Sequence, residues 1–240
     1  MNIAFYNASL ALKAYQKNID NLSNNIANVS TTGFKGATAD FEDLLYTQID
    51  ARSPQLSQGH GVRLASLKTD FTQGFLQRTE KQLDFAILGE GFFAFGEQDG
   101  TVFSRNGAFS LSANGDSMHL VDSAGRKVLD SRLQPISIPL DANGNPVLGE
   151  VLDQLGVFRF DNPGGLIKST DSSWTASENS GMPEAIQDEI ALFQGALEMS
   201  NVEIGSSMAA LIEGQRALQL NSRVIVTADQ IEEIINTLRG

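Results

Sequence analysis

The chain has 240 residues, 41% of them hydrophobic, which is enough for one large domain or two smaller ones with a sizeable core. It carries 17 basic and 29 acidic residues, a net charge of −12, and this acidic balance argues against nucleic acid and anionic membrane surfaces as partners. It contains no cysteine, which excludes disulfides, a thiol nucleophile and Cys-ligated metals.

The first thirty residues carry an unbroken heptad pattern. Its apolar positions, in alternating steps of three and four, are Phe5, Ala8, Leu12, Tyr15, Ile19, Leu22, Ile26 and Val29. This spacing is typical of a helix that pairs with another helix. The outward positions, such as Lys13 and Lys17, are polar. Weak helix formers follow, so we expect the helix to end near Asn28.

This N-terminus has no basic region and no apolar cluster, so the sequence predicts no cleaved signal peptide. No stretch of the chain approaches 18 consecutive apolar residues, so we also expect no membrane insertion.

The segment after the first helix is predicted to be extended or linking. Phe34 is expected to be a buried anchor, and Lys35 is expected to stay in solvent. Phe41 to Ile49 fit a helical or an extended conformation equally well. Residues 51–61 have the composition of an exposed loop.

From Val62 to about Trp174 the pattern favours short antiparallel strands separated by Asn-Gly and Asp-Gly turns. The expected strands are 75–79, 83–87, 92–95, 101–104, 108–112, 118–122 and 127–129. Pro135 and Pro139 flank an expected edge strand. Ser169 to Gly181 reads as a polar loop with Trp174 as its one large anchor.

A second helical region is predicted after Pro183, from about Ile186 to Leu238. One apolar face consists of Ile204, Met208, Leu211, Leu218 and Ile225, and an overlapping face consists of Val224, Ala228, Ile231, Ile235 and Leu238. Gly205 and Gly214 each cost roughly 1 kcal/mol against alanine inside a helix. We therefore expect this helix to depend on packing, with the N-terminal helix as its partner.

These patterns predict an α+β fold, in which N- and C-terminal helices pair as a coiled coil around a central antiparallel β-rich domain. The expected boundaries are residues 1–30 and 184–240 for a terminal helical domain, 31–74 for an extended linker, and 75–183 for the β-rich domain.

No motif indicates catalysis. Gly89-Glu90-Gly91 lacks the third glycine of a dinucleotide loop and precedes a strand. His60 and His119 have no second histidine or carboxylate at ligand spacing. No Gly-x-Ser-x-Gly elbow is present. We therefore expect no catalytic residues, no cofactor and no metal, and predict that the protein is not an enzyme.

Several motifs resemble one protein family. They are Asn24–Lys35, Phe41–Tyr46, Leu88–Phe93, Phe103–Phe109, Ser200–Val202, Gln215–Ala217, Asn221-Ser222 and Thr227–Gln230. In this order, and across almost the whole chain, they are similar to segments of bacterial flagellar rod and hook proteins. The family motif falls on Asn25, Asn28, Gly33 and Phe34. The resemblance is greatest to distal rod members; proximal rod members and short hook proteins stay open.

The resemblance implies a structural subunit of the basal-body rod, an axial tube that transmits torque and contains the export channel. Such subunits leave the cytoplasm unfolded through the flagellar type III export apparatus. They polymerise with themselves as a helical array and contact other rod and hook proteins. The alternatives are a hook subunit, a secreted binding module on a coiled-coil stalk and, third, a carboxylate-based hydrolase.

The apolar stripes predict which residues would form the subunit interface. They are Phe5, Leu12, Tyr15, Ile19, Leu22, Ile26, Val29, Ile204, Met208, Leu211, Leu218, Ile225, Ile231, Ile235 and Leu238. We expect the two ends to be loosely ordered in the monomer and to become ordered as subunits stack.

Overall fold

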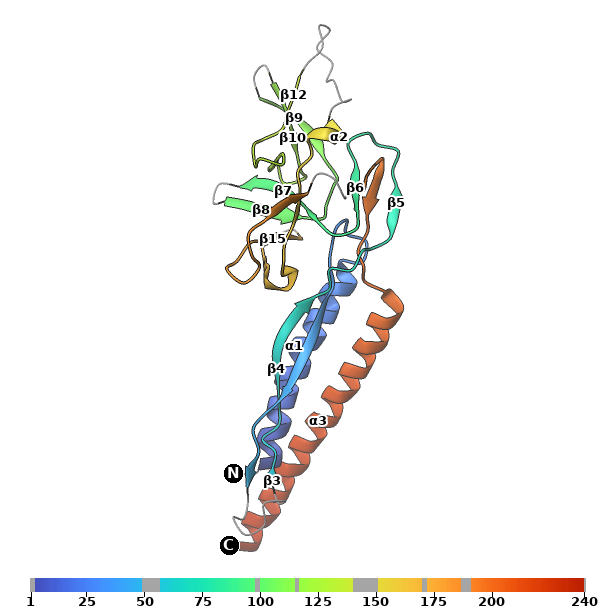
Figure 1. Ribbon diagram of the computed structural model, residues 1–240. Helices are drawn as coiled ribbons and strands as arrows, with labels where there is room; N and C mark the ends of the chain where they lie inside the picture. Colours follow the sequence, from blue (N-terminus) through green and yellow to red (C-terminus); the bar gives the residue numbers. More distant parts are fainter. Residues whose placement is uncertain are drawn as a thin grey trace. The chain divides into compact units, whose positions relative to one another are not determined.

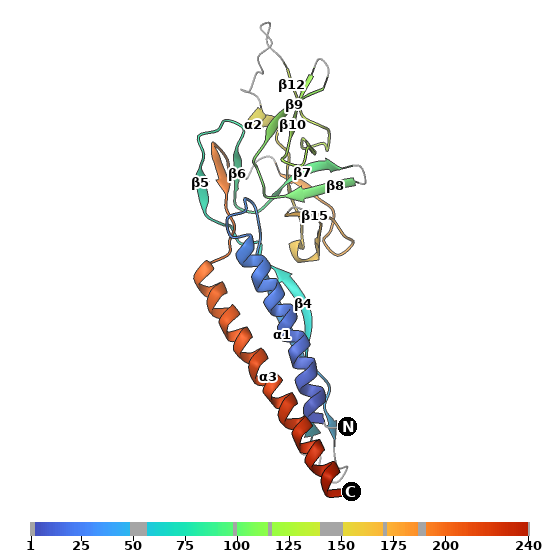
Figure 2. The same ribbon diagram turned by 180° about the vertical axis from the view of Figure 1, so that it is seen from behind.

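The computed structural model of the chain describes residues 3–48, 57–97, 100–114, 117–139, 151–169, 172–186 and 191–239. The chain forms two compact units (Figures 1 and 2). Unit 1 comprises Met1–Ala27, Ala37–Asp70 and Glu203–Gly240, and unit 2 comprises Asn28–Gly36 and Phe71–Val202. The domain boundaries expected from the sequence, at residues 30, 74 and 183, remain a prediction.

In its described residues, unit 1 has two long helices and two small antiparallel ribbons. Its elements are α1 (Ile3–Ala27), β1 (Ala37–Asp43), β2 (Thr47–Gln48), β3 (Ser57–Gln58), β4 (Val62–Thr69) and α3 (Ile204–Arg239). The blue α1 and the orange-red α3 lie side by side and run in opposite directions (Figures 1 and 2). β1 pairs with β4 along α1, and β2 pairs with β3.

Unit 2 is an antiparallel β structure with two short helical turns. Its elements are β5 (Leu76–Arg78), β6 (Phe85–Leu88), β7 (Phe92–Glu97), β8 (Gly100–Ser104), β9 (Ser110–Asn114), β10 (Ser117–Val121), β11 (Lys127–Val128), β12 (Ser137–Ile138), α2 (Val151–Gln154), β13 (Val157–Arg159), η1 (Pro163–Gly165), β14 (Ile167–Lys168), β15 (Ser173–Thr175), β16 (Glu184–Ile186), β17 (Ala191–Gln194) and β18 (Ala196–Glu198). The predicted fold class, with terminal helices that pack together and an antiparallel β-rich middle, is confirmed.

The main sheet of unit 2 has the strand order β12-β10-β11-β7-β8-β15-β14 in the described residues. β9 pairs with β10, β13 with β7, and β16 with β13. In the described ranges β12 pairs with β10 alone, which confirms the edge strand that the two prolines predicted. Trp174 is a buried anchor as expected, but it lies in β15, so the prediction of a loop there is wrong.

The helix predicted from about Ile186 begins only at Ile204, so its predicted start is wrong. Residues 191–198 form one extended segment instead, interrupted by Gly195. Its first half, β17, pairs with β6, and its second half, β18, pairs with β5. Pairing with two strands from earlier in the chain outweighs the helical preference of Ala, Leu and Glu. By contrast, α1 ends at Ala27, next to the predicted boundary, and the segment left open after it is extended as β1.

The core of unit 2 lies on both faces of the sheet. Along β7, Phe93 and Phe95 contribute to one buried cluster, while Phe92 and Ala94 contribute to a second, which also contains Trp174. Successive side chains of a strand point to opposite faces, so a strand covered on both sides needs an unbroken apolar run. The four residues from Phe92 to Phe95 supply that run, which confirms the predicted buried strand.

Truncating a core phenylalanine should destabilise unit 2. Phe93→Ala should lower the free energy of unfolding by about 3–5 kcal/mol, because it removes a ring with 0% exposure and leaves a cavity. Phe75→Ala is the matched control, because that ring is 76% exposed. The single tryptophan, Trp174, lies in the core, so urea unfolding followed by its fluorescence reports on unit 2. Equal losses in both variants would contradict this packing.

Candidate assembly surface on the terminal helices

The side of α3 that is covered alternates large and small residues. Leu211, Leu218 and Ile225 are half-buried, whereas Gly214, between the two leucines, and Ala228, one turn after Ile225, are buried. These positions, with Asn221, follow the 3-4 spacing of a coiled-coil stripe. α1 is the main neighbour of α3, so this stripe is what packs on α1. Sequence reasoning placed Ala228 on an apolar face but missed Gly214 and Asn221, because it counted only apolar side chains.

Gly214 allows the two helices to approach closely. A Cβ added there would lie 3.2 Å from Cγ1 of Ile19 on α1. The glycine therefore weakens the helical preference of α3 but removes a side chain that would hold α1 away. Gly205 has nothing within 4 Å of the same position, so it has no comparable packing role.

Two different elements contact α1, namely α3 and the β1–β4 ribbon. The heptad stripe of α1 therefore has two kinds of neighbour. The ring of Tyr15 lies 5.7 Å from that of Phe41 on β1. The side-chain amides of Asn21 and Asn25 both donate to the carbonyl of Ala37, at 2.6 and 2.8 Å. The amide of Ala37 donates back to Oδ1 of Asn25. Asn25 thus fixes the start of the ribbon on the helix.

The predicted interface residues divide into two groups by exposure. Half-buried in the chain are Leu12, Tyr15, Ile19, Leu22, Ile26, Val29, Leu211, Leu218 and Ile225. Exposed are Phe5, Ile204, Met208, Ile231, Ile235 and Leu238. The first group, apart from Val29, which belongs to unit 2, therefore packs within unit 1, while the second is available for contact. That they form an interface between copies stays a prediction.

The motif after α1 turns the chain by specific contacts in unit 2. Thr31 donates from its hydroxyl to Oδ1 of Asn28 and from its amide to the Asn28 carbonyl. Gly33 has a φ of 67°, and a Cβ there would lie 2.4 Å from the backbone nitrogen of Asn106. Only glycine fits this position. Phe34 is buried as predicted, with Nζ of Lys168 4.8 Å from its ring centre.

Lys35 is buried, so the prediction that it stays in solvent is wrong. Its Nζ donates to Oε1 of Glu198 at 2.6 Å and to the carbonyl of Thr72 at 2.6 Å. Arg105 donates to the other oxygen of Glu198 at 3.1 Å and to the carbonyl of Gly89 at 2.7 Å. The amide of Gly74 also donates to Glu198. Sequence reasoning missed this cluster, because its members lie up to 163 positions apart.

The buried cluster is electrostatically demanding. Burial lowers the pKa of Arg105, and the charge of Glu198 opposes that shift. The guanidinium group also lies 5.5 Å from the ring centre of Phe92. Two cations and one carboxylate inside a protein are tolerable only when they are hydrogen-bonded to one another. The cluster is therefore structural. Its hydrogen bonds join residues 33–35, residues 72–74, Gly89, Arg105 and Glu198.

In the part of the chain that the structure describes, no group of three or more His, Asp or Glu side chains is placed to hold a metal ion. Nor is any described helix long and apolar enough to cross a membrane. His119 lies in β10, where its Nδ1 is 3.3 Å from the carbonyl of Ile136.

The chain is an α+β protein whose N- and C-terminal helices pack on each other and whose middle is antiparallel β structure, and comparisons with known proteins define its family. Residues 5–35 match "Flagella basal body rod protein", residues 86–148 match "Flagellar hook protein FlgE/F/G D1 domain", and residues 194–238 match "Flagellar basal body rod FlgEFG protein C-terminal".

Relatives from several bacteria match over nearly the whole chain. The flagellar basal-body rod protein FlgG of Borreliella burgdorferi is 35% identical and covers 98% of both chains. FlgG of Agrobacterium fabrum is 34% identical, covering 95% of this chain and 96% of its own. The flagellar hook-basal body complex protein FlhP of Bacillus subtilis is 31% identical over 97% of each. The chain belongs to the flagellar basal-body rod protein family and is FlgG-like.

The role of Gly214 can be tested with the same substitution at both glycines. Gly214→Gln should destabilise the helix pair by about 1–3 kcal/mol, because its Cβ would lie 3.2 Å from Cγ1 of Ile19 and the two helices would have to shift apart. Gly205→Gln should be neutral or stabilising by a few tenths of a kcal/mol, since glutamine is the better helix former. Thermal melting followed by far-UV circular dichroism measures both. A stabilising Gly214→Gln would contradict the close approach of the helices.

The buried cluster predicts a large cost for losing one charge. Glu198→Gln should lower the stability of unit 2 by about 3–5 kcal/mol, because it leaves Lys35 and Arg105 buried without a counter-charge. Glu97→Gln, at an exposed position of the same unit, should change it by less than about 0.5 kcal/mol. Urea unfolding followed by Trp174 fluorescence distinguishes the two. A loss below about 1 kcal/mol for Glu198→Gln would show that the cluster is not needed.

Proposed function

We propose that this chain is a structural subunit of the flagellar basal-body rod and polymerises with copies of itself through its terminal helices. Family membership supports the place of action, the basal body, and the structural role. The relatives are named as rod proteins, which favours a structural over a catalytic role.

The observation that carries self-assembly is the apolar surface of the terminal helices. Large exposed side chains on these helices are Ile3, Phe5, Tyr6, Ile204, Met208, Ile212, Leu220, Val224, Val226, Ile231, Ile234, Ile235 and Leu238. Covering a half-exposed isoleucine or leucine contributes about 1 kcal/mol. So extended an apolar surface is typical of a protein that binds another protein.

The exposed surface continues to the end of α3 because the two helices differ in length. α3 has 36 residues and α1 has 25. All residues from 231 to 238 are exposed, including four large apolar ones. A helix end of this composition is stabilised mainly by packing. Contacts with a neighbouring subunit would supply that packing.

In this proposal one copy contacts the next with a different surface, and the rotation from copy to copy does not close a ring, so a helical polymer forms. Such a polymer, continuous with other rod and hook proteins, would transmit torque and enclose the export channel. Passage through the flagellar type III export apparatus is part of the same proposal.

A hook subunit is the second candidate, because two of the matched family descriptions include FlgE and one names the hook. A binding module on a coiled-coil stalk predicts a closed oligomer of fixed size, so an open polymer argues against it.

Self-assembly can be tested with Ile231→Ala/Ile235→Ala. Both side chains are about half exposed, at 48% and 49%, so the change should leave monomer stability unaltered. If neighbours cover them, the critical concentration for polymerisation should rise at least about tenfold, since each loses about 1 kcal/mol. Sedimentation and electron microscopy measure the polymer.

Ile167→Ala is the control, because this isoleucine is exposed in unit 2. Unchanged polymerisation by the double variant would contradict the proposed use of α3. A single discrete oligomer from the unaltered chain would favour the stalked module.

A further inference from the structure

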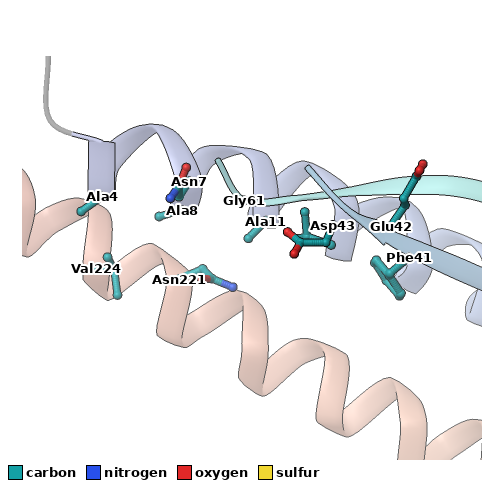
Figure 3. A pocket seen from close by; sticks show the side chains of 11 residues that line it. Ala4, Asn7, Ala8, Ala11, Phe41, Glu42, Asp43, Gly61, Asn221 and Val224 are labelled. Atoms are coloured by element: carbon teal, nitrogen blue, oxygen red, sulfur yellow. The ribbon is translucent and has the colours of Figure 1, made fainter. Parts of the chain in front are cut away.

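Unit 1 contains a hollow of about 570 Å³ between α1, the β1–β4 ribbon and α3. Its walls are mostly small and apolar: Ala4, Ala8 and Ala11 on α1, Val62 on β4 and Val224 on α3. Figure 3 shows the alanines of α1 and Val224 of α3 on opposite sides of this space. Apart from Phe41, the apolar side chains of this lining are no larger than valine, so the hollow has room for side chains from outside unit 1.

Two acidic residues, Glu42 and Asp43, line this hollow, and they differ in their partners. Side chains alternate along β1, so Asp43 shares a face with Phe41, which packs on α1, while Glu42 points the other way (Figure 3). Glu42 pairs with Arg63 at 2.8 Å on the outer side. Asp43 accepts a hydrogen bond from the hydroxyl of Tyr46 at 2.6 Å. Among the described residues, no lysine or arginine pairs with Asp43.

Two further observations indicate that the hollow presents negative charge and hydrogen-bond acceptors. The hydrogen bond to Asp43, and then its charge, raise the pKa of the Tyr46 hydroxyl. Asn7 also lines the hollow, and its buried Oδ1 has no hydrogen-bond partner in the described residues, whereas its Nδ2 donates to the carbonyl of Gly59. A carboxylate and an amide oxygen beside an alanine-lined wall match a side chain with an apolar stem and a cationic end.

The chain carries such side chains on the outside of α1. Lys13 and Lys17 lie one helical turn apart, both are exposed, and neither forms an ion pair with any described residue. Lysine has a long apolar stem and a compact charge with three donors. In a chain with a net charge of −12, two unpaired lysines on one helix face are a distinct basic patch.

We infer that the Lys13–Lys17 face of α1 docks on this hollow of a second copy and brings a lysine ammonium to Asp43. This inference rests on the proposed self-assembly and names one contact within it. The apolar ends of the helices would supply most of the binding energy, and the charge pair would fix which faces meet.

Exchange of the charges tests this contact. Lys13→Glu/Lys17→Glu and, separately, Asp43→Lys should each raise the critical concentration for polymerisation about tenfold, because like charges then meet. The variant with all three changes should return to within about threefold of the unaltered chain. Sedimentation measures the polymer, and circular dichroism checks the helices. Lys81→Glu and Asp161→Lys, at exposed positions of unit 2, are the matched controls and should have no effect.

Three outcomes would overturn the inference. Charge reversal could leave polymerisation unchanged, or the triple variant could polymerise no better than its parents. Alternatively, Arg52→Glu could weaken assembly and be rescued by Asp43→Lys, which would identify this chain's own Arg52, outside the described residues, as the occupant. If the charge variants polymerise like the unaltered chain, the proposed lysine contact is wrong but the proposed self-assembly still stands. An unaltered chain that never polymerises overturns the proposed function as well.

Discussion

Unit 2 depends on one buried carboxylate. Glu198 accepts hydrogen bonds from Lys35, Arg105 and the amide of Gly74, and its own carbonyl accepts from the amide of Gly33. Neither the acid nor the two cations reach solvent to any useful extent. Each charge is therefore tolerable only while the others are in place. The segments that carry these residues can therefore pack stably only when all of them are in place. The cluster thus favours one arrangement of the chain over others that would leave a buried charge unpaired.

Unit 1 is organised by the opposite principle. Small residues on α3, above all Gly214, let the helices approach, and hydrogen bonds from Asn25 hold the β1–β4 ribbon on α1. These contacts cover one stripe of α3 and leave its other faces apolar and exposed. Unit 2 buries most of its aromatic residues, whereas unit 1 leaves apolar surface of its helices exposed. The proposed assembly would bury this exposed apolar surface between copies. One chain can therefore combine a unit with its own core and a unit that is completed by its neighbours.

The parts of the fold that could be predicted from the sequence are those governed by local pattern. The unbroken run from Phe92 to Phe95 and the heptads of α1 have only one sensible interpretation each. The parts that could not be predicted depend on distant partners. Residues 191–198 have a composition that suits a helix, and only their pairing with β5 and β6 makes them strands. Lys35 looks like a surface residue until Glu198 is placed beside it. The interface residues themselves remain a prediction, because a single chain does not contain their partner.

The segment shared by β17 and β18 has a consequence for the order in which the chain folds. β5 and β6 lie early in unit 2, yet the strand that pairs with both of them ends only at Glu198. Until this segment is available, both strands keep an open edge, and Lys35 and Arg105 lack the acid that compensates them. Contacts between such distant residues form slowly, because a long loop must close first. Completion of the β unit is therefore a late event, because β5 and β6 gain their partners only when residues 191–198 are available.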